Sequence, residues 1–222
     1  MTQGNENNGL KETMSIACCY LWRRLTHNEA VPTLNHYNIF ILTMAANYAK
    51  GSKPQVSSTE PRWSRPNPRH VKLNVDASFH EDVGAGASGA ILRDYQGQFI
   101  VASCRYLPNV SSAAAAEAIA MKDGLDLAIR LGCNSIIAES DSLETIEACN
   151  GTETWWNDSV AIFADIVDQV TNIGAVQFNH IPREANKVAD ELARKGFSDK
   201  MHCIWDDDPP SFILSSFLND VT

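Results

Sequence analysis

The sequence predicts an α/β domain downstream of residue 69, and three observations support this. In residues 71–79, apolar and polar side chains alternate, the period-two pattern of a strand with one face in a core. Residues 112–131 carry small and apolar side chains at helical spacing and end at a glycine, a common helix stop. Residues 135–140 form an apolar strand that ends where another helical pattern begins. Strands that alternate with helices are typical of this fold class.

The first strand carries an acid in its interior. Asp76 lies on the face opposite Leu73 and Val75. Aspartate is depleted in strands and is rarely buried without a partner. Asp76 is therefore either part of a solvated face or a metal ligand, and the strand by itself favours the solvated face.

Three further acids add weight to the metal-ligand interpretation. Glu117 lies on the small-residue, inward stripe of its helix, where a carboxylate is costly unless something pairs with it. Asp141 follows directly after the 135–140 strand. Asp190 lies in a helical pattern that begins with Pro182, a residue favoured in the first helical turn.

Two short motifs have structural alternatives. Asp141 followed by Ser142-Leu143-Glu144 has the pattern of a helix N-cap with a capping box, a role that can coexist with metal binding. Residues 84–89 read Gly-Ala-Gly-Ala-Ser-Gly, which matches the glycine pattern of dinucleotide sites. A strand-turn-strand pattern follows it instead of a helix, so we expect these glycines to shape a turn and a closely packed strand.

Together these motifs resemble the ribonuclease H type 1 family. They are Val-Asp-Ala-Ser around Asp76, Ala-Glu-Ala around Glu117, Glu-Ser-Asp-Ser around Asp141, and His-Ile-Pro-Arg-Glu-Ala-Asn-Lys-Val-Ala-Asp over residues 180–190. The four motifs occur in the family's order and cover about residues 69–198. Within the family, the chain is most similar to plant reverse-transcriptase-like domains of retroelement origin.

The resemblance implies a ribonuclease H-like fold, with a mixed five-stranded sheet and helices on both faces. It also implies a carboxylate site that binds two Mg²⁺ or Mn²⁺ ions and cleaves the RNA strand of RNA/DNA hybrids. The family's metal-binding and catalytic acids fall on Asp76, Glu117, Asp141 and Asp190, and its flexible catalytic histidine falls on His180. The residues expected to contact substrate are Ala77, Ser78, Ser112 and Asn186.

Physical chemistry gives reasons for such a set of residues. In-line cleavage of a phosphodiester needs an activated water and a stabilised leaving oxygen, which two ions about 3.5–4 Å apart supply together. Hard divalent cations select carboxylate oxygens, and clustered acids repel one another until cations bind. Histidine is the side chain that ordinarily changes its charge near neutral pH, so a histidine at position 180 is suited to protonate the leaving group or assist product release.

Other features of the sequence favour a second hypothesis. Residues 70–200 hold 10 basic and 19 acidic side chains, whereas phosphate contacts usually need a basic surface. Ala113 and Ala114 occupy the place of substrate-binding asparagines in bacterial members, and Trp155 and Trp156 lack the basic neighbours of the family's hybrid-binding handle. The alternative function is a non-catalytic or weakly active module, derived from a retroelement, that binds nucleic acid or protein.

The remaining chain divides into four parts by composition. Residues 1–50 contain two plausible short helices, residues 51–68 form a proline-rich linker, residues 69–198 form the domain, and residues 199–222 form an acidic tail. The six cysteines lack metal-site spacing, so we expect reduced thiols. No secretory or membrane-spanning pattern is recognised. We therefore expect a soluble intracellular monomer, in the nucleus or the cytoplasm.

Overall fold

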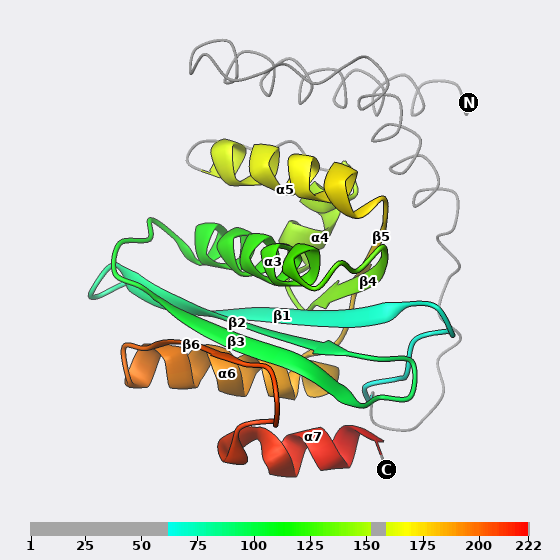
Figure 1. Ribbon diagram of the computed structural model, residues 1–222. Helices are drawn as coiled ribbons and strands as arrows, with labels where there is room; N and C mark the ends of the chain where they lie inside the picture. Colours follow the sequence, from blue (N-terminus) through cyan, green and yellow to red (C-terminus); the bar gives the residue numbers. More distant parts are fainter. Residues whose placement is uncertain (1–61, 152–158, 222) are drawn as a thin grey trace, which may run out of the picture.

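A computed structural model describes residues 62–151 and 159–221, and within them the chain forms one mixed β-sheet covered by helices on both faces (Figure 1). The strands are β1 (Val71–His80), β2 (Ala85–Arg93), β3 (Phe99–Leu107), β4 (Ser135–Ser140), β5 (Ala175–His180) and β6 (His202–Trp205). Their order across the sheet is β5-β4-β1-β2-β3-β6. The prediction of a mixed sheet is confirmed, but the prediction of five strands is wrong, because β6 pairs antiparallel with β3.

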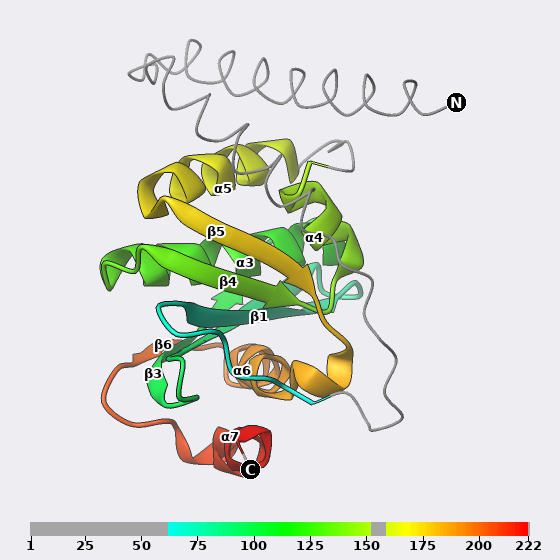
Figure 2. The ribbon, with the colours of Figure 1, turned by 90° about the vertical axis from the view of Figure 1, so that its right-hand side faces the viewer.

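The helices divide between the two faces of the sheet. The helices on one face are α3 (Ala113–Arg130), α4 (Leu143–Cys149) and α5 (Val160–Ile173), and those on the other are α6 (Lys187–Ser198) and α7 (Leu214–Val221) (Figures 1 and 2). Short 3-10 turns, Arg183–Ala185 and Ser211–Ile213, precede α6 and α7. The larger hydrophobic core lies between the sheet and the helices α3, α4 and α5. A smaller core lies between the sheet and the helices α6 and α7.

The glycines of residues 84–89 behave as the sequence predicts. Gly84 has a φ of +56° in the turn between β1 and β2, a conformation that side chains with a Cβ rarely adopt. Gly89 lies within β2, where a Cβ would come 2.5 Å from the main-chain oxygen of Ala189 in α6. The motif therefore lets α6 approach the sheet closely, and the expectation of a turn and a strand is confirmed.

Helix α4 corrects one detail of the sequence analysis. Its N-cap is Ser142, whose side-chain oxygen accepts a hydrogen bond from the Thr145 amide. The capping box predicted at Asp141 is therefore wrong, because the helix begins one residue later than that pattern requires. The cap leaves the Asp141 carboxylate available for other contacts.

The segments that flank the 69–198 region contribute to the packed structure. Trp63 lies in the core with 5% of its surface exposed, within a stretch expected to be a linker. Residues 202–221, expected to be an acidic tail, contain β6 and α7. The domain boundaries themselves stay a prediction, and the two N-terminal helices expected within residues 1–50, along with Trp155 and Trp156, lie outside the described residues.

Two negative findings apply to the described ranges. Their cysteines, Cys104, Cys133, Cys149 and Cys203, are free thiols. None of their helices has the length and apolar character needed to cross a bilayer.

Candidate metal centre

The four predicted acids come from four different elements. Asp76 lies in β1 and Asp141 directly follows β4, while Glu117 lies in α3 and Asp190 in the first turn of α6. Strands β1 and β4 are parallel, and their last paired residues are Asn74 and Glu139. Asp76 and Asp141 both stand two residues further on, so they lie at the same level of the sheet.

The end of the β1–β4 pairing explains how acids from both faces of the sheet can meet. Gly89, the cross-strand partner of Asp76, contacts α6, so Asp76 also belongs to the α6 face. Glu117 comes from α3 on the opposite face. The pairing of β1 with β4 stops at Asn74, although β1 itself continues to His80. Asp76 therefore lies where β4 no longer flanks β1, and there the Glu117 carboxyl group hydrogen-bonds to it.

Burial and mutual repulsion shift the protonation of this pair strongly. Burial, followed by repulsion from Asp141 and Asp190, raises the pKa of Asp76 to about 7. Burial, followed by repulsion from Asp76 and Asp141, raises the pKa of Glu117 to about 9. The pKa of Asp76 thus responds to each of the other three acids, so the structure brings all four into electrostatic contact. At neutral pH the pair holds at least one proton, which a bound cation would displace.

The residues fit a hard divalent cation. Glu117 has a buried carboxylate oxygen, Oε2, that accepts no hydrogen bond from any donor among the described residues. Such an orphaned acceptor is costly, and a cation would satisfy it. Among the described residues, no three histidine, cysteine or acidic side chains form a ready-made cation cage. The centre is therefore a hydrogen-bonded Asp76–Glu117 pair on which Asp141 and Asp190 act through their charge.

Asp141 and His180 lie together at the ends of adjacent strands. One carboxylate oxygen of Asp141 accepts a 2.9 Å hydrogen bond from the Asn186 side-chain amide. The exposed His180 ring places Nε2 3.2 Å from the main-chain oxygen of Asp141. The histidine is thus beside the acids and open to solvent, a position suited to proton transfer.

Asp190 pairs with two arginines that the sequence analysis did not single out. Arg183 approaches one carboxylate oxygen at 3.2 Å and Arg194 approaches the other at 3.1 Å. The spacing of Asp190 and Arg194 by four residues is a signal of a helical ion pair that could have found the second contact. These side chains bring positive charge to an otherwise acidic centre.

The residues predicted to contact substrate have protein contacts of their own. Ser78 donates a hydrogen bond to the main-chain oxygen of Ala193, and Ser112 caps α3. Ala77 packs against the core on the α3 face, and Asn186 is 1% exposed. Their roles toward substrate stay a prediction, and main-chain groups remain the means by which Ala77 would act.

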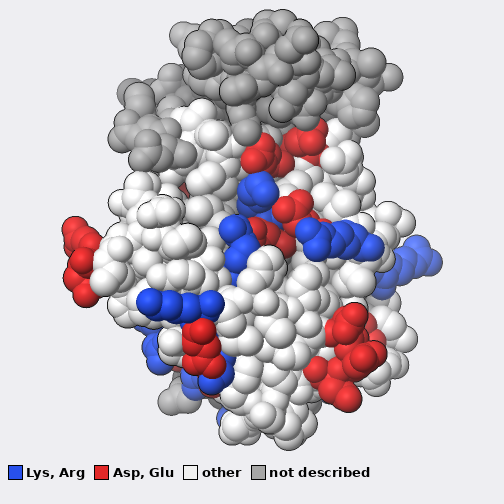
Figure 3. Space-filling model, turned by 60° about the vertical axis from the view of Figure 1, so that its left-hand side comes forward, with Lys and Arg blue, Asp and Glu red and all other residues white. Residues whose placement is uncertain are grey.

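The face of the molecule drawn in Figure 3 gives little sign of a broad basic footprint. On the face shown in Figure 3, basic and acidic side chains are interspersed among uncharged ones, without a continuous basic patch. Phosphate contacts normally supply much of the affinity for nucleic acids. Affinity for a nucleic acid at this face would therefore depend on a few local cations.

Comparison with solved structures identifies the fold as that of ribonuclease H. The N-terminal RNase H domain of rv2228c from Mycobacterium tuberculosis superposes with a TM-score of 0.55 and 19% identity, covering 59% of this chain and 94% of that one. RNase H1 from the archaeon Halobacterium salinarum gives 0.55 and 21%, with coverages of 59% and 98%. LC11-RNase H1 in complex with an RNA/DNA hybrid gives 0.55 and 20%, also with coverages of 59% and 98%. At these identities the likeness establishes the fold alone.

The sequence itself defines the family. The reverse transcriptase-like family model matches residues 74–196, more than half of the chain. The chain therefore belongs to the reverse transcriptase-like family, a group with the ribonuclease H-type fold, as its motifs predict. A search of curated proteins finds no significant match.

Proposed function

We propose that this protein is a metal-dependent endoribonuclease that cleaves the RNA strand of RNA/DNA hybrids. The observation that carries the proposal is the Asp76–Glu117 pair, in which Asp76 is buried and a buried Glu117 oxygen accepts no hydrogen bond from a described donor, beside two further acids. Holding buried like charges together costs free energy, and such perturbed acids concentrate at functional sites. The hybrid bound to LC11-RNase H1, a protein of the same fold, supports the substrate class.

Each side chain has a role in this proposal. Asp76, Glu117, Asp141 and Asp190 would hold two Mg²⁺ or Mn²⁺ ions, which when bound supply an activated water and stabilise the leaving oxygen. Asn186 holds the Asp141 carboxylate in one direction. His180, exposed at the end of β5, donates a proton to the leaving oxygen. Main-chain groups of Ala77 and Ser78, with Ser112 at the start of α3, read the 2′-hydroxyl that distinguishes RNA from DNA.

A strand-specific cleavage assay tests this function. The full chain, with Mg²⁺ or Mn²⁺ at low salt, is mixed with a hybrid labelled on either strand and with duplex DNA of the same sequence. We expect cleavage of the RNA strand only, and loss of at least about a hundredfold in rate for Asp76→Asn, as for removal of an essential catalytic group. The matched control Asp82→Asn, in the exposed turn after β1, should cleave normally. An intact hybrid at high protein concentration would refute the proposal.

The interspersed charges on the face shown in Figure 3 favour a second candidate function. In this alternative, the domain is a retroelement-derived module that binds nucleic acid or protein without cleaving. It predicts that a hybrid, or a captured protein, binds equally to wild type and Asp76→Asn. A monomer is expected in either case, which sedimentation of the full chain would measure.

A further inference from the structure

A buried polar network links the candidate metal centre to segments outside the family match. On the α6 face of β1, Asn74 is two residues from Asp76 and has no exposed surface. Its side-chain oxygen accepts hydrogen bonds from Trp63 Nε1 at 2.9 Å and from Arg93 at 3.0 Å. Trp63 precedes the matched residues 74–196, so an upstream segment contacts this interior position directly.

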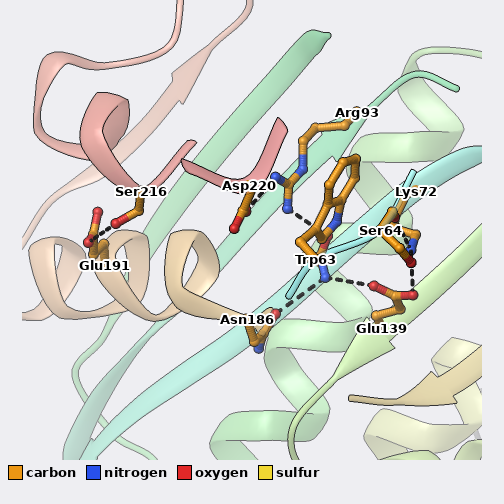
Figure 4. Close-up of polar contacts among 10 residues, drawn as sticks. Trp63, Ser64, Lys72, Arg93, Glu139, Asn186, Glu191, Ser216 and Asp220 are labelled. Atoms are coloured by element: carbon orange, nitrogen blue, oxygen red, sulfur yellow. Dashed lines mark hydrogen bonds and ion pairs between the residues drawn. The ribbon is translucent and has the colours of Figure 1, made fainter. Parts of the chain in front are cut away.

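Arg93 is held from both ends of the described chain (Figure 4). Its guanidinium group is buried and forms a 2.7 Å ion pair with Asp220 in α7. The indole ring of Trp63 stacks over it at 3.8 Å, and Phe217 of α7 lies 5.9 Å away. A buried arginine needs such pairing and aromatic stacking, because an uncompensated charge would be strongly destabilising. Trp63 and Asp220 therefore fix the position of the guanidinium group.

The same network continues from Asn74 toward Asp141. The Asn74 side-chain amide nitrogen lies 3.1 Å from a Glu139 carboxylate oxygen and 3.4 Å from the side-chain oxygen of Asn186. The Asn186 amide nitrogen donates at 2.9 Å to the Val75 main-chain oxygen and at 2.9 Å to the Asp141 carboxylate. Two buried asparagines thus stand in series between Trp63 and a predicted metal ligand.

The chemistry of the end groups fixes which way each amide points. Tryptophan and arginine nitrogens only donate, so Asn74 must turn its oxygen toward Trp63 and Arg93. Its NH₂ group then faces the Glu139 carboxylate and the Asn186 oxygen, which leaves the Asn186 NH₂ group toward Asp141. A reversed Asn186 would set an amide oxygen against the Asp141 carboxylate, which is repulsive, and would leave buried polar groups unsatisfied.

We propose that Trp63 and Arg93, with Asp220 behind them, are positioning residues that orient the Asn186 amide and thereby the Asp141 carboxylate. Trp63 and Asp220, which lie outside the matched residues 74–196, then help to shape the candidate metal centre. The proposal rests on the proposed function for its catalytic meaning, but the orientation of the amides is a property of the protein without metal or substrate. A role limited to stability would leave Asn186 and Asp141 in place whenever the variant is folded.

We call the chain of hydrogen bonds from Trp63 through Asn74 and Asn186 to Asp141 the relay. NMR signals of the side-chain amides in the metal-free, full-length protein test it. The key variant is Trp63→Phe, which keeps an aromatic ring against Arg93 and removes only the Nε1 donor. Asp220→Asn, a nearly isosteric change that removes the ion pair to Arg93, is the second variant. The matched control is Trp205→Phe, because Trp205 packs edge-on against Phe212 and lies on β6, which β2 and β3 separate from β1. The spectrum of Asn186→Ala identifies the Asn186 signals.

We expect the Asn186 NH₂ signals to shift in Trp63→Phe and to exchange with solvent about two- to tenfold faster, as for loss of one hydrogen bond of ordinary net strength. Asp220→Asn should cause a smaller change in the same direction, and Trp205→Phe should cause none. Unchanged Asn186 signals in a folded Trp63→Phe protein would refute the relay, as would equal effects of Trp63→Phe and Trp205→Phe.

A Mn²⁺ titration of the same proteins separates this inference from the proposed function. Trp63→Phe should need several times more Mn²⁺ than wild type for half-saturation, while Trp205→Phe should match wild type. If wild type shows no binding of Mn²⁺, the proposed function is overturned. The Asn186 amide signals would still show whether the relay exists. Equal Mn²⁺ affinity in wild type and Trp63→Phe would overturn the link between the relay and the metal centre.

Discussion

Replacing Glu117 by glutamine should stabilise the metal-free protein at neutral pH. The Glu117 carboxyl group has a pKa of about 9, raised from 4.5 chiefly by burial and then by the charge of Asp76. A group whose folded pKa is raised stabilises the fold below its unfolded pKa, and that contribution is lost as pH rises toward the folded pKa. Glutamine is neutral at every pH and can still hydrogen-bond to Asp76, so it avoids this loss.

The size of the effect follows from the pKa shift. Between 4.5, the ordinary value, and pH 7, keeping Glu117 protonated costs about 1.4 kcal/mol per pH unit, or about 3 kcal/mol in total. Asp76, with its pKa raised to about 7, adds a loss in the same direction between pH 3.8 and 7. The two acids share one interaction, so their losses do not simply add.

Urea unfolding in the presence of a chelator measures this prediction. Wild type should lose stability from pH 4.5 to 7, and Glu117→Gln should lose markedly less. At pH 7 the variant should be the more stable protein, by an amount on the order of 3 kcal/mol. The control Glu81→Gln, in the exposed turn after β1, should follow wild type. A wild-type stability that stays flat over this pH range, or a less stable Glu117→Gln, would refute the reasoning.

Two further predictions concern the parts that surround this pair. Millimolar Mg²⁺ or micromolar Mn²⁺ should raise the melting temperature of wild type, with a stabilisation of roughly 2.7 kcal/mol at a hundredfold excess over the dissociation constant. Asp141→Asn should weaken this response while leaving the metal-free protein at least as stable, and an equal response in both proteins would exclude Asp141 as a ligand. Gly89→Ala should destabilise the fold by several kcal/mol, because its Cβ would collide with the main chain of α6. Denaturant unfolding measures this loss. Gly132→Ala is the control, because an added Cβ there meets open space and its destabilisation comes from the positive φ alone, without a collision.

The local patterns of the chain were enough to predict the elements that carry the centre. The alternation in residues 71–79 predicted β1, and the small-residue stripe ending at Gly132 predicted α3. Asp76 and Glu117 stand out because each violates a local preference, whereas Asp141 and Asp190 were recognised by their places in the family's motifs. In the folded chain the charges of Asp141 and Asp190 raise the pKa of Asp76, while the roles of the four acids as ligands stay a prediction.

The details that local patterns missed are those in which two choices are locally equivalent. Asp141 and Ser142 are both good N-cap residues, and only the end of β4 decides that Ser142 caps α4. β6 has four residues, too few for an alternating pattern, and becomes a strand by pairing with β3. Its strand conformation is therefore set by a partner about a hundred residues away, which propensity alone does not report.

The sequence by itself thus determined the fold class and the family, and it predicted the four acids as ligands, because all of these rest on residue types at short spacing. The tertiary structure decided which polar groups meet in the interior. Trp63, Asn74 and Arg93 look like a linker residue, a strand polar residue and a strand-end cation, and no short-range spacing joins them. They form one network because folding buries all three at the same place, where each unpaired polar group would be costly.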